Sequence, residues 1–239
     1  CAVPDFPTLT DENINAAVDL WLSDESIAED TYGHISDWDV SSVTNMNHLF
    51  YDAPSFNGDL SSWDISSVTY MRGMFLAASS FNGDLSSWDV SSVTDMNATF
   101  QSADSFNGDL SSWDVSSVTD MGLLFIGANN FNGDISSWDV SSVTDISNIF
   151  NGAGSFNGDL SSWDVSSVTA MAAMFYNASS FNGDISSWDV SSVTVMTLLF
   201  EGASALSEEN QCLIHTSFSS NSAWPYDWSV YCPAVCGDL

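Results

Sequence analysis

The chain has 239 residues, and 44% of them are hydrophobic, which is enough for a large buried core and argues against disorder. Its 32 acidic residues stand against one basic residue, for a formal net charge of −31 at pH 7. This charge excludes nucleic acid as a partner, because phosphates would be repelled, and it favours cations and basic partners.

Residues 1–30 are predicted to form an N-terminal helical cap. An amphipathic helix is expected to begin at Thr10, a good N-cap residue, and to end near Trp21, because Ile14 and Val18 recur with Trp21 on one face. A cap is needed at this end because the first unit of a repeat array would otherwise expose its apolar side to water.

Residues 31–205 contain seven repeats of one length. Tryptophan marks the same position in every repeat, at a spacing of twenty-five residues without insertions: Trp38, Trp63, Trp88, Trp113, Trp138, Trp163 and Trp188. A fixed period in this range indicates a solenoid, in which each unit contacts only its neighbours along one axis.

Each repeat is predicted to contain one short strand and one short helix. Apolar residues in segment 60–68 of the second repeat place Trp63 inward and Asp64 outward, as on a strand. The Met-x-x-Met-Phe sequence at 71–75 has helical spacing, and Thr69 suits the N-cap position before it.

These elements predict an α/β solenoid. We expect a leucine-rich-repeat-like right-handed coil with a parallel β-sheet on one face and short helices on the other, and a parallel β-helix is the alternative. The Asn-Gly-Asp sequence closing each repeat is expected to make the return turn, because Asn and Gly tolerate positive φ. The asparagines of these turns should form a ladder that bonds the backbones of successive coils: Asn57, Asn82, Asn107, Asn132, Asn157 and Asn182.

Residues 206–239 are predicted to form a cysteine-containing C-terminal cap. All the cysteines of the chain lie outside the repeats: Cys1, Cys212, Cys232 and Cys236. Their even number and the lack of zinc-ligand spacing favour two disulfides, whose pairing stays open. Glycosylation sequons at Asn97 and Asn177 fit a secreted protein.

The repeats read WDVSSVTDMxxxFxxAxxFNGDL with small variations, and they are preceded by AAVDLWL and YGHISDWDVSSVTNM. In these sequences the chain resembles the BspA-like bacterial surface protein repeat family, a leucine-rich-repeat relative, over residues 14–203. The resemblance implies surface display, adhesion or protein interaction, and it brings no catalytic residues. We therefore expect a secreted or cell-surface location, with other proteins or cell-surface and matrix components as partners.

No run of about eighteen apolar residues is present, so we expect no transmembrane segment and read the chain as a soluble, processed product.

An aspartate follows each tryptophan of the repeats. On the predicted strands these carboxylates would form one outward column: Asp39, Asp64, Asp89, Asp114, Asp139, Asp164 and Asp189. Carboxylates about 5 Å apart repel by roughly 0.8 kcal/mol in water. Raised pKa values, hydrogen bonds from the flanking serines or bound cations would relieve this repulsion. The column is therefore a candidate site for weak, multivalent binding of Ca²⁺, another divalent ion or a cationic partner.

The sequence favours a non-enzymatic extracellular or cell-surface scaffold for adhesion, protein interaction or extracellular assembly, including side-by-side self-association. The predicted caps argue against head-to-tail stacking. A carbohydrate-active enzyme is a weaker alternative, because paired carboxylates can hydrolyse glycosides but these aspartates are copies in equivalent surroundings. Ice binding by regular serine and threonine rows is another alternative, against which the charge of the aspartate column weighs.

Overall fold

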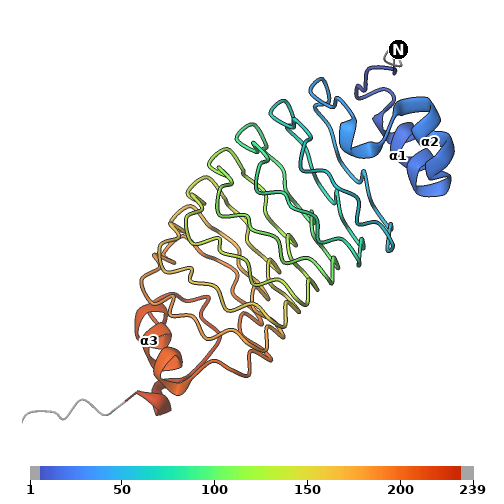
Figure 1. Ribbon diagram of the computed structural model, residues 1–239. Coiled ribbons are helices and arrows are strands. Elements are labelled where there is room, and N and C mark those ends of the chain that lie inside the picture. The colour runs from blue at the N-terminus through green and yellow to red at the C-terminus, as the bar shows by residue number, and fades with distance from the viewer. Residues whose placement is uncertain (1–5, 233–239) are drawn as a thin grey trace, which may run out of the picture.

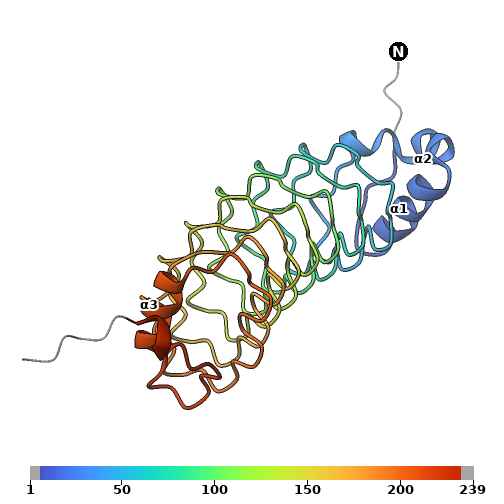
Figure 2. The ribbon, with the colours of Figure 1, turned by 90° about the horizontal axis from the view of Figure 1, so that it is seen from below.

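The computed structural model describes residues 6–232, which form an elongated stack of coils with helices at both ends (Figure 1). The same stacking is visible from below in Figure 2. The N-terminal end carries helices α1 (Ile14–Ser23) and α2 (Glu25–Tyr32) and the short 3-10 helix η1 (Ile35–Asp37). The C-terminal end carries α3 (Glu208–Phe218) and the 3-10 helix η2 (Ser229–Tyr231).

The predicted fold class is wrong. From residue 38 to residue 205 the repeats contain no β-strand, no sheet and no helix, so neither the leucine-rich-repeat plan nor the parallel β-helix describes them. The β-type pairing between neighbouring coils is limited to isolated parallel bridges, which run from Asn45 with Tyr70 to Ala170 with Val195. The coils are built from successive turns, which hydrogen bonds between neighbouring coils hold in place.

The segment predicted to be a strand forms two consecutive turns. The N–H of Trp63 donates to the carbonyl of Leu60 at 3.1 Å, and the N–H of Val68 donates to that of Ile65 at 2.8 Å. All four side chains are buried. Serine pairs fill both turns, and Asp and Ser favour turns because their side chains bond nearby backbone groups. The apolar spacing that suggested a strand therefore comes from two turns in series.

The segment predicted to be a helix forms a row of hydrogen bonds along the stack. We call residues 45–52 and their equivalents in each coil, up to 195–202, the axial row. In the second coil the N–H groups of Met71, Gly73, Phe75 and Ala77 donate to carbonyls of the next coil at 2.8–3.1 Å. Gly73 and Ala77 have φ values of 58° and 61°, and equivalent positive values recur in every coil. A left-handed residue interrupts an α-helix, so helical spacing here does not produce one.

Stacked aromatic rings fill the interior of the coils. The rings of Trp113 and Trp138 lie 6.4 Å apart, and those of Phe100 and Phe125 lie 5.6 Å apart. The indole N–H of Trp113 donates to the carbonyl of Leu85 in the preceding coil at 3.0 Å. Among the described residues no buried side-chain nitrogen or oxygen lacks a partner. The core therefore combines close packing with complete hydrogen bonding.

The predicted asparagine ladder is confirmed. The side-chain oxygen of Asn57 accepts the N–H of Asn82 at 2.8 Å, and the same bond links each later return turn to the next as far as Asn182. The last rung passes from Asn182 to the N–H of Ser207 in the C-terminal cap. An amide at this position therefore ties successive turns together, as the repetition of FNGD suggested.

The N-terminal cap contains one more helix than predicted. Helix α1 begins at Ile14 rather than Thr10, and α2 is an additional helix. The Asp11 carboxylate accepts the N–H groups of Thr44 and Asn45 at 2.7 and 3.0 Å. It replaces the carbonyl of a preceding coil, because Thr69 donates to the carbonyl of Thr44 in the same way. Desolvation raises the pKa of Asp11, but the bonds from Thr44 and Asn45 outweigh it and the pKa is lowered.

Candidate binding surface

The aspartates that follow the tryptophans lie at turns and not on a strand. Oδ1 of Asp114 accepts the N–H of Ser116 at 3.1 Å and its hydroxyl at 2.6 Å. The N–H bond recurs at 2.9–3.1 Å at every equivalent position. We call this set the first aspartate column: Asp39, Asp64, Asp89, Asp114, Asp139, Asp164 and Asp189.

Serine hydrogen bonds set the ionisation of this column. The hydroxyl and then the backbone N–H of Ser66 lower the pKa of Asp64, whereas the charges of Asp39 and Asp89 raise it by less. The pKa is lowered at all the other members as well. Of the three means of relief expected from the sequence, raised pKa values are therefore excluded and serine hydrogen bonds are present.

A second aspartate column lies at the return turns and repeats the same geometry. Oδ1 of Asp59 accepts the N–H and hydroxyl of Ser61 at 3.0 and 2.7 Å. Its members are Asp59, Asp84, Asp109, Asp134, Asp159 and Asp184. The two columns arise because every repeat after the first contains the pentapeptide Asp-apolar-Ser-Ser-apolar twice, as in DLSSWDVSSV at 109–118. This duplication is visible in the sequence but was missed when the segment was interpreted as a strand.

Divalent-ion binding by the first column remains a prediction. Within the part of the chain that the structure describes, no three His, Cys, Asp or Glu side chains converge as a metal centre would require. The serine bonds of the column go to Oδ1, so Oδ2 of each exposed carboxylate is left for solvent or a partner. One oxygen per aspartate suits bridging to external cations better than enclosed coordination.

Arg72, the single basic residue, neutralises a separate acidic group on the axial row. Its guanidinium lies 3.0 Å from Asp95 and 3.2 Å from Asp120, and it donates to Asn97 at 3.3 Å. Asp145 continues this row one coil further along. The Arg72 side chain is 42% exposed, so these ion pairs contribute little to stability. The alignment of these three aspartates was not predicted, because the position after Val-Thr carries Asp in only three of the seven repeats.

The two sequons have different surroundings. Asn97 is half-buried and donates its amide to Asp120 at 3.1 Å, and Thr99 of the same sequon is fully buried. Asn177 and Ser179 are both exposed. A glycan on Asn97 would displace these contacts, so Asn177 is the sequon that the folded chain can present.

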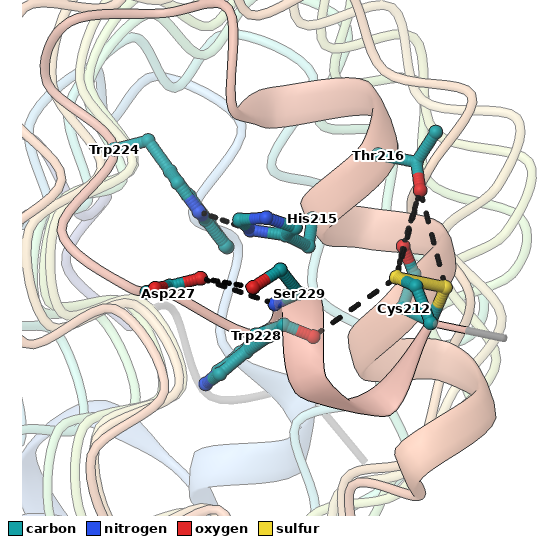
Figure 3. The surroundings of a disulfide bond; sticks show 8 residues. Cys212, His215, Thr216, Trp224, Asp227, Trp228 and Ser229 are labelled. Atoms are coloured by element: carbon teal, nitrogen blue, oxygen red, sulfur yellow. Dashed lines mark hydrogen bonds between the residues drawn. A yellow bond between two sulfur atoms is a disulfide. The ribbon is translucent and has the colours of Figure 1, made fainter. Parts of the chain in front are cut away.

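One of the expected disulfides is present, between Cys212 of α3 and Cys232 (Figure 3). Cys1 and Cys236 lie outside the described residues. Beside the disulfide, the indole N–H of Trp224 donates to Nδ1 of His215 at 3.1 Å, so this histidine has a structural role in the cap (Figure 3). A disulfide fits an oxidising, extracellular compartment.

No helix within residues 6–232 is both long and apolar enough to cross a membrane.

Comparison with known proteins identifies one family. The family model described as "Mycoplasma protein of unknown function, DUF285" matches residues 23–125 and 107–212. The two matches overlap and together include every repeat of the stack. No curated protein and no solved structure matches the chain.

Proposed function

This chain belongs to the family described as Mycoplasma protein of unknown function, DUF285, and on that premise we propose that it is a non-enzymatic, extracellular or cell-surface scaffold for adhesion. In this proposal the two aspartate columns bind cationic surfaces of partner proteins or matrix components. The partners are basic because the chain carries a formal net charge of −31.

The observation that carries the proposal is the fixed, ionised state of the columns. The serine bonds hold each carboxylate in one orientation, and the lowered pKa values keep the first column charged at neutral pH. Each carboxylate binds one cationic group of the partner weakly, and the column binds the partner more strongly as a whole. Each contact that forms raises the effective concentration of the partner's remaining cationic groups at the remaining carboxylates. A partner with several exposed lysines or arginines supplies the complementary surface.

The uniformity of the columns supports a scaffold in preference to an enzyme. A glycosidase needs two carboxylates with different roles, whereas these aspartates share the same serine partners. A cavity of about 710 Å³ lies beside the last coil, but within the described chain its lining includes a single carboxylate, that of Asp189. The disulfide and the resemblance to BspA-like surface proteins support an extracellular setting.

Calcium enters the proposal as a bridging ion. The free Oδ2 atoms can share a divalent ion with carboxylates of a second molecule or of an acidic partner, which would permit side-by-side association. Such an ion would be held between molecules, because no metal centre is formed among residues 6–232.

The test is retention on a polylysine-coated surface, measured in rising sodium chloride and in chelator. The variant Asp89→Asn, Asp114→Asn, Asp139→Asn removes three charges from the first column. The control Asp19→Asn, Glu25→Gln, Asp30→Asn removes three exposed charges from α1 and α2. We expect the column variant to elute at clearly lower salt than the control. Equal loss in both variants would show that net charge alone causes retention and would contradict the proposal.

The calcium part is tested by sedimentation with calcium, magnesium or sodium chloride at matched ionic strength. We expect calcium to increase the mass of the parent and to leave the column variant unchanged. An equal increase in all three salts would indicate screening alone and would remove calcium from the proposal.

A further inference from the structure

Every second N–H of the axial row donates to a carbonyl of the next coil, and these hydrogen bonds point the same way along the stack. The N–H of Met46 donates to the carbonyl of Tyr70 at 2.8 Å, and the N–H of Met71 donates to that of Asp95 at 3.1 Å. Donors therefore face the next coil, and carbonyls face the previous one. The edge of a β-sheet differs, because a strand presents N–H and C=O groups on the same side. This row consequently has a donor end and an acceptor end.

The acceptor end lies at the first coil. The carbonyls of Asn45, Asn47, Leu49 and Tyr51 receive no hydrogen bond from residues 6–232, although their equivalents in the second coil all do. Asp11 bonds the N–H groups of Thr44 and Asn45 at this end and leaves these carbonyls open.

The donor end lies at the last coil. The N–H groups of Met196, Leu198 and Gly202 find no acceptor within the described chain. The fourth donor of this row, the N–H of Phe200, is bonded by the hydroxyl of Tyr226 at 2.9 Å. Apart from Phe200, which the cap already bonds, the two ends therefore present complementary backbone groups at the spacing of the repeat itself.

Apolar side chains are exposed at the same two ends. Leu198 is 53% exposed, whereas Leu123, at the equivalent position of an inner coil, is half-buried because the next coil covers it. Tyr51 at the acceptor end is 56% exposed, whereas Leu76, at the equivalent position of the second coil, is half-buried. A further coil placed on the donor end would bury the same surface that inner coils bury.

We propose that two copies of this chain join head to tail, with the axial row of the last coil of one copy docked on the first coil of the next. The internal register of the stack pairs Leu198 with His48 and Glu201 with Tyr51 of the second copy. A second copy is the partner that fits, because it supplies parallel carbonyls at the repeat's own spacing. The contact is heterologous, so it generates chains or rings of molecules.

The caps leave Tyr51 at one end of the axial row and Leu198 at the other exposed to solvent. Trp21 packs on Trp38 at 5.9 Å, and Trp228 packs on Phe200 at 5.5 Å, so the caps cover the aromatic core. The expectation that caps exclude head-to-tail stacking applies to the core and not to the axial row. The net charge opposes association, so the contact should strengthen as salt screens it.

The test is sedimentation of the parent over a range of concentrations, in chelator and high salt, which removes bridging by cations. We expect the mass to rise with concentration. Tyr51→Glu places a carboxylate opposite Glu201, and Val195→Glu with Leu198→Glu places charges on the donor end, so each variant alone should be monomeric. A mixture of the two retains one intact end of each kind and should form a dimer.

Two further variants make the test specific for the register. Glu201→Lys added to Tyr51→Glu should restore association, because it replaces like charges by opposite charges. Tyr70→Glu, at an exposed tyrosine outside the contact, should associate like the parent. A parent that stays monomeric at every concentration, or end variants that associate as the parent does, would overturn the proposal. Retention on polylysine does not depend on this contact, so the two proposals fail separately.

Discussion

Replacement of Trp113 by alanine removes a buried indole from the middle of the stack. The side chain is 3% exposed, it packs against Phe100 at 6.1 Å, and its N–H bonds the carbonyl of Leu85. A cavity left by such a residue costs about 3–5 kcal/mol. A buried carbonyl left without its donor costs about 1–3 kcal/mol. We therefore expect Trp113→Ala to destabilise the stack by at least about 3 kcal/mol.

Trp113→Phe separates the two contributions, because it keeps an aromatic ring in the stack and removes the N–H donor. It should cost about 1–3 kcal/mol. Tyr70→Ala, at an aromatic residue that is 46% exposed, is the control and should change stability by less than about 1 kcal/mol. Stability is measured by scanning calorimetry and by hydrogen exchange, because repeat arrays can unfold in parts. If Trp113→Ala melts with the parent and with Tyr70→Ala, the tryptophan ladder does not stabilise the stack as argued.

Three other predictions test the turns, the charges and the cap. The pKa values of the first aspartate column, such as that of Asp114, are lowered, so folding favours the ionised carboxylates. Their contribution to stability is complete above about pH 5 and is lost as pH falls through the folded-state pKa values. A melting temperature that rises on acidification below about pH 4 would show that charge repulsion dominates. Gly127→Ala should cost about 1 kcal/mol in chemical denaturation, because φ at Gly127 is +66°. Gly154→Ala should be close to neutral in the same measurement, because φ at Gly154 is not positive and an added Cβ would have its nearest neighbour at 3.6 Å. Equal costs for the two glycines would contradict the assignment of left-handed backbone to the axial row. Cys212→Ser removes a disulfide between cysteines 20 residues apart and should lower the stability of the C-terminal cap by about 3 kcal/mol. Amide hydrogen exchange should then be faster in α3 than in the middle coils. Uniform exchange along the chain would show that the disulfide does not act locally.

Much of the stack could be predicted because the information repeats in the sequence. The burial of Trp63, Val68 and Phe75 follows from apolar residues that return every twenty-five positions, whatever backbone carries them. The asparagine ladder followed from the same repetition, since a polar residue retained at a tight turn needs a partner. The reason expected for the return turn was wrong, because the glycines before the second aspartate column, such as Gly58, have no positive φ. Each member instead bonds the turn that follows it, as Asp59 does at Ser61.

The secondary structure could not be predicted in this way. Leu60, Trp63, Ile65 and Val68 have a spacing that fits either a strand or two turns, and only the bonds from Trp63 to Leu60 and from Val68 to Ile65 distinguish them. Helical spacing at 71–75 was equally ambiguous, because three apolar positions do not reveal that Gly73 has positive φ. Local periodicity reports which side chains are buried, and several backbone paths can bury the same set.

The sequence by itself determined the period, the acidic surface and the residues of the core. Only the tertiary structure decided the backbone, because every second N–H of the axial row in the inner coils finds its acceptor in the next coil, about one repeat away in the sequence. These bonds hold residues such as Leu123, with φ of +64°, in a conformation that its side chain disfavours locally. The direction of the same bonds gives the stack unlike ends. That polarity is a property of stacked coils, so no single repeat contains it.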